Sequence, residues 1–262
     1  MRFRFGRLFI ACGCLLLSGC FEAVYEQRLK TANEHFKHQE ILDSNLGPVW
    51  FGTGLAFRVP KEFELIPPPE APAAEGDGAA EATPQIDRRQ PDFIGMELPG
   101  LVGAWKANVT VSGQPASAYA YIMTNQALMA MPPGPDRPNP AEFTNKTIED
   151  LSRAAKISLK PEDWINESFP KQSGFITPVN YQSAVQESTR EVAGKKMRYL
   201  IYRSQQGDLQ AIVMFVIPSN TSDPIIDKLP ISLETLVMQG GVSAAPAGGA
   251  PGGGGGAGGS AL

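Results

Sequence analysis

The strongest hydrophobic pattern lies near the C-terminal end of this 262-residue chain, between Lys196 and Pro218. Two runs rich in β-branched and aromatic residues flank Gln206-Gly207-Asp208. The first run alternates apolar and polar residues, whereas the second contains AIVMFVI (211–217), which is apolar at every position. Alternation is typical of a half-exposed strand, and an unbroken apolar run is typical of a strand buried on both faces. The pattern predicts two paired strands in a sheet that needs helices to cover it.

Two helices are predicted near these strands. Asn139 as N-cap, Pro140 at the first position and Glu142 three residues after the cap signal a helix start. Its expected buried stripe is Phe143, Ile148, Leu151 and Ala155. A second helix begins at Pro224 after a cap at Ser222 or Asp223 and ends at Gly240-Gly241, with a kink or break at Pro230. Its expected stripe is Ile225, Ile226, Leu229, Leu233, Leu236 and Val237.

Earlier segments alternate more weakly. Residues 54–66 predict a strand interrupted at Pro60, and residues 105–125 predict two strands around a turn at Gly113-Gln114-Pro115. Gly52-Thr53-Gly54 begins like a dinucleotide-binding fingerprint, but Phe57 stands where the third glycine belongs, so a turn is predicted there instead.

A polar stretch from Phe21 to about Asn45 carries apolar residues at three- and four-residue steps, which predicts an amphipathic helical tether. The stripe consists of Tyr25, Leu29, Ala32, Phe36 and Leu42. We expect it to pack on the folded domain, with a partner protein as the alternative.

Two segments have too few large apolar residues to offset the entropy of ordering a chain. Residues 67–91 begin with a Pro/Ala/Glu-rich stretch, and residues 240–262 are mostly Gly and Ala. We expect a disordered insertion and a disordered tail. The fold class predicted is therefore α/β (α+β): one domain over 47–239 with a mostly antiparallel sheet flanked by helices, after a tether over 20–46.

The order of these elements resembles the PsbP-like α/β sandwich family, from the strand beginning AFRVPKEFEL to the final helix after an all-apolar strand. The likeness covers most of residues 48–239 and has no diagnostic motif, and the insertion departs from it. It would imply a binding or assembly factor without catalytic residues.

The N-terminus has the layout of an export signal. Arg2, Arg4 and Arg7 precede an apolar run from Leu8 to Leu17, which is too short to span a bilayer. Leu17-Ser18-Gly19-Cys20 then resembles the lipobox of bacterial lipoproteins, in which a peptidase removes the signal, here residues 1–19, and the cysteine is lipidated. The alternative is an ordinary signal peptide with a chance cysteine near its end.

The lipobox resemblance implies a lipid-anchored protein of the bacterial cell envelope, with acyl chains on Cys20 as its contact with the membrane. In that family an aspartate after the cysteine often retains the product in the inner membrane. Phe21 stands there, so the outer membrane is the expected location. The other expected partner is an envelope protein of unknown identity.

Removing residues 1–19 takes away three arginines and no acids, so 23 − 3 = 20 basic residues face 27 acidic ones and the formal charge falls from −4 to −7. This negative net charge does not favour binding to nucleic acid, because the phosphate backbone binds clustered lysine and arginine side chains.

Candidate chemistry is sparse. His35 and His38 are the two histidines of the chain and lie in the tether, where two such ligands make a poor metal site. We therefore expect solvated helix residues, no metal and no cofactor. The acidic pairs Glu149-Asp150 and Glu162-Asp163 fit helix starts better than an active site. Trp50, Trp105 and Trp164 are expected as core anchors, although tryptophans also stack on ligands.

No catalytic residue is predicted. The expected function is a non-catalytic binding, scaffold or assembly domain, and the alternative is an envelope hydrolase whose carboxylates converge in three dimensions. A deep pocket with two raised carboxyl pKa values would favour the hydrolase.

Overall fold

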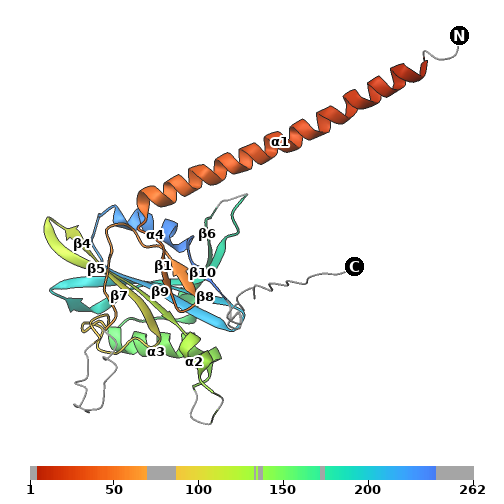
Figure 1. Ribbon diagram of the computed structural model, residues 1–262. Helices are drawn as coiled ribbons and strands as arrows, with labels where there is room; N and C mark the ends of the chain where they lie inside the picture. Colours follow the sequence, from red (N-terminus) through yellow and green to blue (C-terminus); the bar gives the residue numbers. More distant parts are fainter. Residues whose placement is uncertain (1–4, 70–86, 133, 135–137, 172–174, 240–262) are drawn as a thin grey trace, which may run out of the picture.

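The computed structural model describes residues 5–69, 87–132, 134, 138–171 and 175–239, and for residues 5–23 it describes the backbone alone. It contains one sheet-rich domain with flanking helices, which confirms the predicted fold class (Figure 1). The helices are α1 (Phe5–Asn45), α2 (Gln126–Ala130), α3 (Phe143–Ala155) and α4 (Ile225–Leu233), with short 3-10 turns η1 (Pro140–Glu142) and η2 (Pro161–Asp163).

The large sheet has seven antiparallel strands in the order β3-β4-β5-β9-β8-β7-β6, and a small sheet has the order β1-β2-β10. The large sheet contains β3 (Glu64–Leu65), β4 (Leu101–Val111), β5 (Gln114–Thr124), β6 (Ile165–Phe169), β7 (Val179–Val192), β8 (Lys195–Gln206) and β9 (Leu209–Pro218). The small sheet contains β1 (Trp50–Gly52), β2 (Leu55–Phe57) and β10 (Val237–Met238).

Strand β9 is the buried centre of the large sheet, as its apolar run predicts. All of its residues are buried, and Met214 pairs with Tyr121 of β5 on one side and Ile201 of β8 on the other. The β8–β9 turn is formed by Gly207 and Asp208, and Gly207 has a φ of 61° that glycine adopts without strain.

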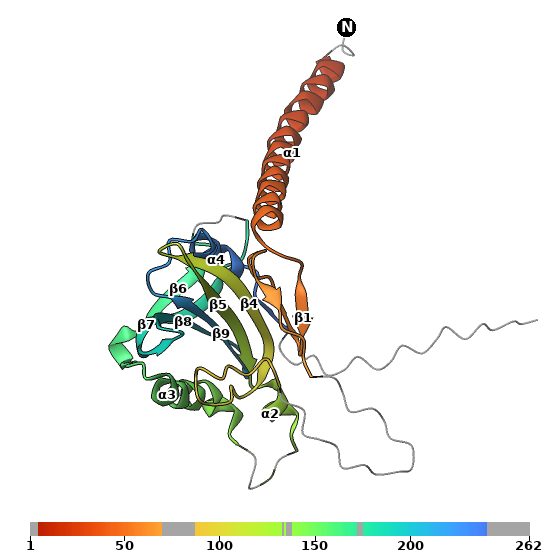
Figure 2. The same ribbon diagram turned by 90° about the vertical axis from the view of Figure 1, so that its left-hand side faces the viewer.

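Two hydrophobic cores cover the two faces of this sheet. Helix α3 contributes its predicted stripe, all buried, to a core with Tyr121 and Tyr199. Helix α4 and the small sheet contribute to the other core, which contains Phe57 and Phe215. Figure 2 shows α3 and α4 on opposite sides of the sheet, so the domain has three layers.

The second predicted helix is shorter than its apolar stripe suggested. Asp223 caps it by accepting a hydrogen bond from the Ile225 amide, and Pro230 lies inside it. The helix ends at Leu233, and Val237 lies instead in β10, opposite Ala56 of β2, with its side chain half-exposed. The prediction that Val237 continues the buried stripe is therefore wrong, because pairing with the free edge of β2 replaces the last helical turn.

Turns also differ slightly from the prediction. The β4–β5 turn is formed by Ser112 and Gly113, both with positive φ, and Gln114 and Pro115 already belong to β5. The turn at Thr53-Gly54 is as predicted: it connects β1 and β2, and both of its residues have positive φ.

Helix α1 includes residues 20–45 of the predicted tether and projects away from the domain (Figure 1). The side chains of Tyr25, Leu29 and Phe36 are 63%, 51% and 71% exposed. The expectation that the apolar stripe packs on the domain is therefore wrong for these residues. Contact with the domain begins at His35 and His38, whose rings meet Phe175 edge-on. It becomes closer at the end of the helix, where Leu42 is half-buried and Leu46, just after the helix, is fully buried.

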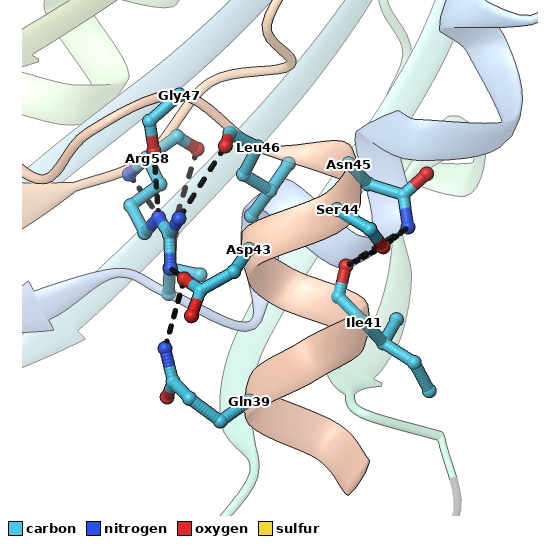
Figure 3. Close-up of polar contacts among 9 residues, drawn as sticks. Gln39, Ile41, Asp43, Ser44, Asn45, Leu46, Gly47 and Arg58 are labelled. Atoms are coloured by element: carbon cyan, nitrogen blue, oxygen red, sulfur yellow. Dashed lines mark hydrogen bonds and ion pairs between the residues drawn. The ribbon is translucent and has the colours of Figure 1, made fainter. Parts of the chain in front are cut away.

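Arg58 fastens the end of α1 to the domain (Figure 3). Its guanidinium donates to the backbone oxygens of Leu46 and Gly47 at 3.3 and 2.8 Å, and to the Asp43 carboxylate at 2.8 Å. The last carbonyls of a helix lack intrahelical partners and carry partial negative charge, so a cation is favoured there. One buried side chain thus makes three hydrogen bonds that hold the end of α1 at the domain surface.

The predicted insertion over 67–91 lies partly outside the described residues, which omit 70–86. Its last residues contact the domain: Gln90 accepts a hydrogen bond from the Leu98 amide at 2.7 Å, and Pro91 is buried. Residues 87–91 of the predicted insertion are therefore part of the described fold. The predicted tail over 240–262 also lies outside the described residues.

Candidate functional site

A groove of about 670 Å³ opens on the α3 side of the large sheet, where strands β6 to β9 pass the start of α3. Its lining is polar. The residues are Ala141, Thr144, Asn145, Asn166, Glu167, Ser168, Asn180, Tyr181, Gln182, Arg203, Ser204, Gln205 and Gln210.

The strand register explains why so many amide side chains meet here. Asn166 of β6 lies opposite Gln182 of β7, which lies opposite Arg203 of β8. One step along the strands, Ser168 lies opposite Asn180, and Gln205 lies opposite Gln210. Because alternate residues of a strand share a face, these side chains form two polar rows on the face that α3 covers farther along.

Arg203 is the cation of this lining. Its guanidinium lies over the Trp164 ring at 4.3 Å and donates a hydrogen bond to the Asn145 side chain at 3.1 Å. Its Nε is hidden from solvent and has no hydrogen-bond partner among the described residues. Burial lowers the pKa of Arg203 from its ordinary value, but an arginine remains charged at neutral pH.

Buried amides hold the inner wall in place. The Gln210 side chain accepts from the Thr144 amide and hydroxyl at 3.0 and 2.7 Å and donates to the Ala141 carbonyl at 2.9 Å. The fully buried Asn125 accepts from the Gln210 amide at 2.9 Å and donates to the Asp208 carbonyl at 2.8 Å. These satisfied groups attach β9 to the start of α3, so the wall is rigid.

The outer part of the groove contains side-chain amides that form no hydrogen bonds within the described part of the chain. Asn166 and Gln182 are exposed, and their side chains make no hydrogen bond within the described part of the chain. Glu167 lines the groove but its carboxylate belongs to the opposite face, where it accepts from the Ser183 hydroxyl at 2.6 Å. The groove thus offers neutral amides and one positive charge.

This groove was not among the sites predicted from the sequence, although the strand segments carry a signal for it. Polar residues alternate at Asn166 and Ser168, at Asn180 and Gln182, and at Arg203 and Gln205. Such alternation indicates one polar face at the end of each strand, but only the register brings the three strand ends together.

Cys20, the predicted lipidation site, lies in α1, where the backbone alone is described. Within the part of the chain that the structure describes, none of the helices has both the length and the hydrophobicity that a membrane span requires.

His38 is not the solvated residue that we predicted. The last turns of α1 bring its imidazole to 3.4 Å from the Glu234 carboxylate and edge-on to Phe175. Burial, with the charge of His35 as a smaller cause, lowers the pKa of His38. Burial raises the pKa of the Glu234 carboxyl.

The two acidic pairs have structural contacts. Glu149 and Asp150 each pair with Arg153 on the exposed side of α3, at 3.1 Å. Asp163 accepts a hydrogen bond from the Lys160 amide at 2.8 Å and so caps η2. No group of three or more histidine, cysteine or acidic side chains suited to a metal ion occurs in the described part of the chain.

The tryptophans have different surroundings. Trp105 is buried in the α4-side core and meets Trp50 edge-on at 5.3 Å, as expected for core anchors. Trp164 is half-buried beneath Arg203, where it supports a groove residue. The aromatic pair also lines a second groove of about 460 Å³ beside the end of α1.

No family model matches the chain, and no curated protein matches it. Among solved structures, the chain is similar to a Bacteroides thetaiotaomicron VPI-5482 protein whose crystal structure was determined at 1.50 Å resolution. The identity is 7% and the TM-score 0.33, over 71% of this chain and 45% of that one, so this chain spans less than half of its neighbour. The lipobox and PsbP-like resemblances stay predictions.

Proposed function

We propose that this protein is a lipid-anchored lipoprotein of the bacterial cell envelope, whose domain binds a partner and does not catalyse a reaction. Acyl chains on Cys20 attach it to the membrane, and α1 carries the domain outward. The observation that carries this proposal is the combination of Leu17-Ser18-Gly19-Cys20 with a helix that continues from Cys20 to the domain.

The groove supports a binding role. Its lining offers hydrogen-bonding groups on a rigid wall, and its arginine is fixed by Trp164 and Asn145. A preformed polar surface of this kind selects a ligand by shape and hydrogen bonding. The acidic pairs that the sequence offered for catalysis serve instead in salt bridges and a helix cap.

One observation favours the alternative of an envelope hydrolase. Glu234 has a raised carboxyl pKa and lies beside His38, and perturbed titratable groups are frequent at catalytic centres. The pair also connects α1 to α4, which gives it a structural role. The proposed binding function therefore predicts that substitutions in the His38–Glu234 pair change the stability of the protein and do not affect any enzymatic activity.

Fatty-acid labelling in cells tests the lipid anchor. The full-length chain should incorporate a clickable palmitate analogue and fractionate with membranes, and Cys20→Ser should do neither. Cys14→Ser is the matched control, because Cys14 belongs to the predicted signal and should not affect labelling. Labelling of Cys20→Ser would overturn the lipobox assignment.

Turnover assays test the binding role. The purified full-length protein should not hydrolyse peptidoglycan, glycans, esters or peptides, and it should retain a ligand or partner from envelope extract. Reproducible hydrolysis that disappears in Glu234→Gln would overturn the proposal in favour of the hydrolase.

A further inference from the structure

We infer that the polar groove binds a short acidic oligosaccharide, with a carboxylate of the sugar on Arg203 and its hydroxyl or acetamido groups on the neighbouring amides. This inference rests on the proposed binding function and names the ligand class of that function.

The charge of the groove points to one negative group on the ligand. Arg203 is held by Trp164 and by Asn145, and the Glu167 carboxylate points to the other face of the sheet. A planar guanidinium matches a carboxylate with two parallel hydrogen bonds. Its partial burial strengthens an ion pair relative to one in open water.

The amides point to a ligand that both donates and accepts hydrogen bonds along its length. Asn166 and Gln182 extend from Arg203 across two neighbouring strands, and Asn180 and Gln205 form the next row. Each side-chain amide offers two N–H donors and a carbonyl acceptor. Vicinal hydroxyls of a sugar use both kinds of group at once, whereas a phosphate or a simple carboxylic acid uses only the donors.

The dimensions agree with a chain of sugar rings. Neighbouring strands lie about 4.8 Å apart, so the row from Asn166 through Gln182 to Arg203 extends roughly 10 Å across the sheet. The strand spacing is comparable with the length of one pyranose ring. The volume of about 670 Å³ lies within the range of small-ligand sites and has room for a short oligosaccharide.

The lining disfavours a peptide. Apart from Ala141 and Tyr181, all of the lining side chains are polar, so apolar side chains of a peptide would find no pocket. Tyr181 is buried and its hydroxyl is already bonded to the Leu233 carbonyl. An extended peptide on the outer edge of β6 is the competing outcome that the experiment must exclude.

Isothermal titration of the full-length protein in detergent tests the inference with three probes. They are trigalacturonate, the N-acetylglucosamine–N-acetylmuramic acid disaccharide, and neutral cellotriose. One of the two acidic probes should bind saturably and at least about tenfold more tightly than cellotriose. Trigalacturonate binding would indicate a uronic-acid polysaccharide as the source, and disaccharide binding would indicate the cell wall.

Variants then place the binding in the groove. Arg203→Gln should lower the affinity for the acidic probe about tenfold or more. The double variant Asn166→Ala/Gln182→Ala should also lower this affinity, and it should leave the fold intact because neither side chain makes a hydrogen bond within the described part of the chain. Arg153→Gln is the matched control, because Arg153 lies on the exposed side of α3. Melting temperatures identify any variant that has lost its fold.

The inference fails if none of the probes binds, if the double variant and Arg203→Gln bind as tightly as the parent, or if a neutral tetrapeptide displaces the bound sugar. This failure differs from a failure of the proposed function. Loss of the lipid anchor in Cys20→Ser should leave sugar binding intact, and hydrolysis of a bound sugar would overturn the non-catalytic proposal while leaving the site in place.

Discussion

Two partly buried arginines have different roles because their guanidinium edges meet different groups. Arg58 has three hydrogen-bond acceptors at the end of α1, so its donors are engaged within the fold. Arg203 has one hydrogen-bond acceptor among the described residues, the Asn145 side chain, and faces a groove. In the sequence, Arg58 and Arg203 look alike, because each is an arginine within a segment that is predicted to form a strand. Only the surroundings of each side chain separate a structural residue from a candidate ligand-binding residue.

The Phe215 side chain tests the central strand. It is fully buried and lies 6.3 Å from both the Phe63 and Tyr202 rings, measured between ring centroids. We expect Phe215→Asp to destabilise the domain by about 4 kcal/mol or more, because it buries an unpaired charge in a packed core. Urea denaturation measures this loss. Val185→Asp, at a half-exposed position of β7, is the control and should change stability little; equal losses in the two variants would contradict the central-strand assignment.

Glu234 gives a prediction about pH. Burial raises its carboxyl pKa above the unfolded value, so above that folded pKa the folded state carries a charge that the unfolded state solvates better. This penalty is present at neutral pH and disappears as the pH falls below the unfolded value. Glu234 also follows the C-terminal end of α4, where the helix dipole disfavours an anion.

We therefore expect Glu234→Gln to raise the melting temperature at pH 7.5 by on the order of 2 °C, and the difference to shrink towards pH 4. Scanning calorimetry at several pH values measures this. Asp227→Asn is the control, since Asp227 lies in the first turn of α4, where an anion is favourable, and it should not raise the melting temperature. A gain for Glu234→Gln that is equal at pH 4 and pH 7.5 would contradict the argument.

Among the elements, those defined by local pattern could be predicted from the sequence. The unbroken apolar run of β9 and the stripe of α3 carry their own burial signal, and both are confirmed. The end of α4 could not be predicted, because it depends on the edge of β2, which lies about 180 residues earlier in the chain. The amide groove likewise depends on the register of β6, β7 and β8. Patterns within a segment predict its type, and pairing between distant segments decides the site.

Arg58 makes three hydrogen bonds at the junction of α1 with the domain, where the His38–Glu234 pair is a second contact. Arg58→Lys keeps the charge but replaces a planar group with five N–H donors by a single ammonium, which cannot reach all three acceptors at once. We expect amide exchange at residues 43–47 to become about tenfold faster while the sheet is unaffected. Hydrogen-exchange mass spectrometry measures this. Arg153→Lys, in an exposed ion pair, should leave exchange at 43–47 unchanged, and unchanged exchange in Arg58→Lys itself would show that other contacts fasten the helix.

At the scale of the whole molecule, the helix and the proposed lipid anchor together suggest a fixed distance from the membrane. Residues 21–45 form part of the continuous helix α1 and would extend about 38 Å at 1.5 Å per residue. This segment has five acids against three bases, so it gains nothing from an anionic lipid surface. Its exposed side chains at Tyr25, Leu29 and Phe36 could instead bury themselves in the headgroup region if the helix lay flat.

We expect the upright arrangement, because Arg58 fixes α1 where it leaves the domain and the helix projects outward (Figures 1 and 2). Neutron reflectometry of the lipidated protein on a supported bilayer should then show a layer of low protein density, roughly 30–40 Å thick, between the membrane and the domain. Ala32→Pro should reduce this spacing, since proline removes a helical hydrogen bond and kinks the helix, whereas Ala32→Gly should preserve it. A domain in direct contact with the bilayer in the parent protein would show that α1 lies in the membrane surface, and its apolar stripe would then be a membrane contact.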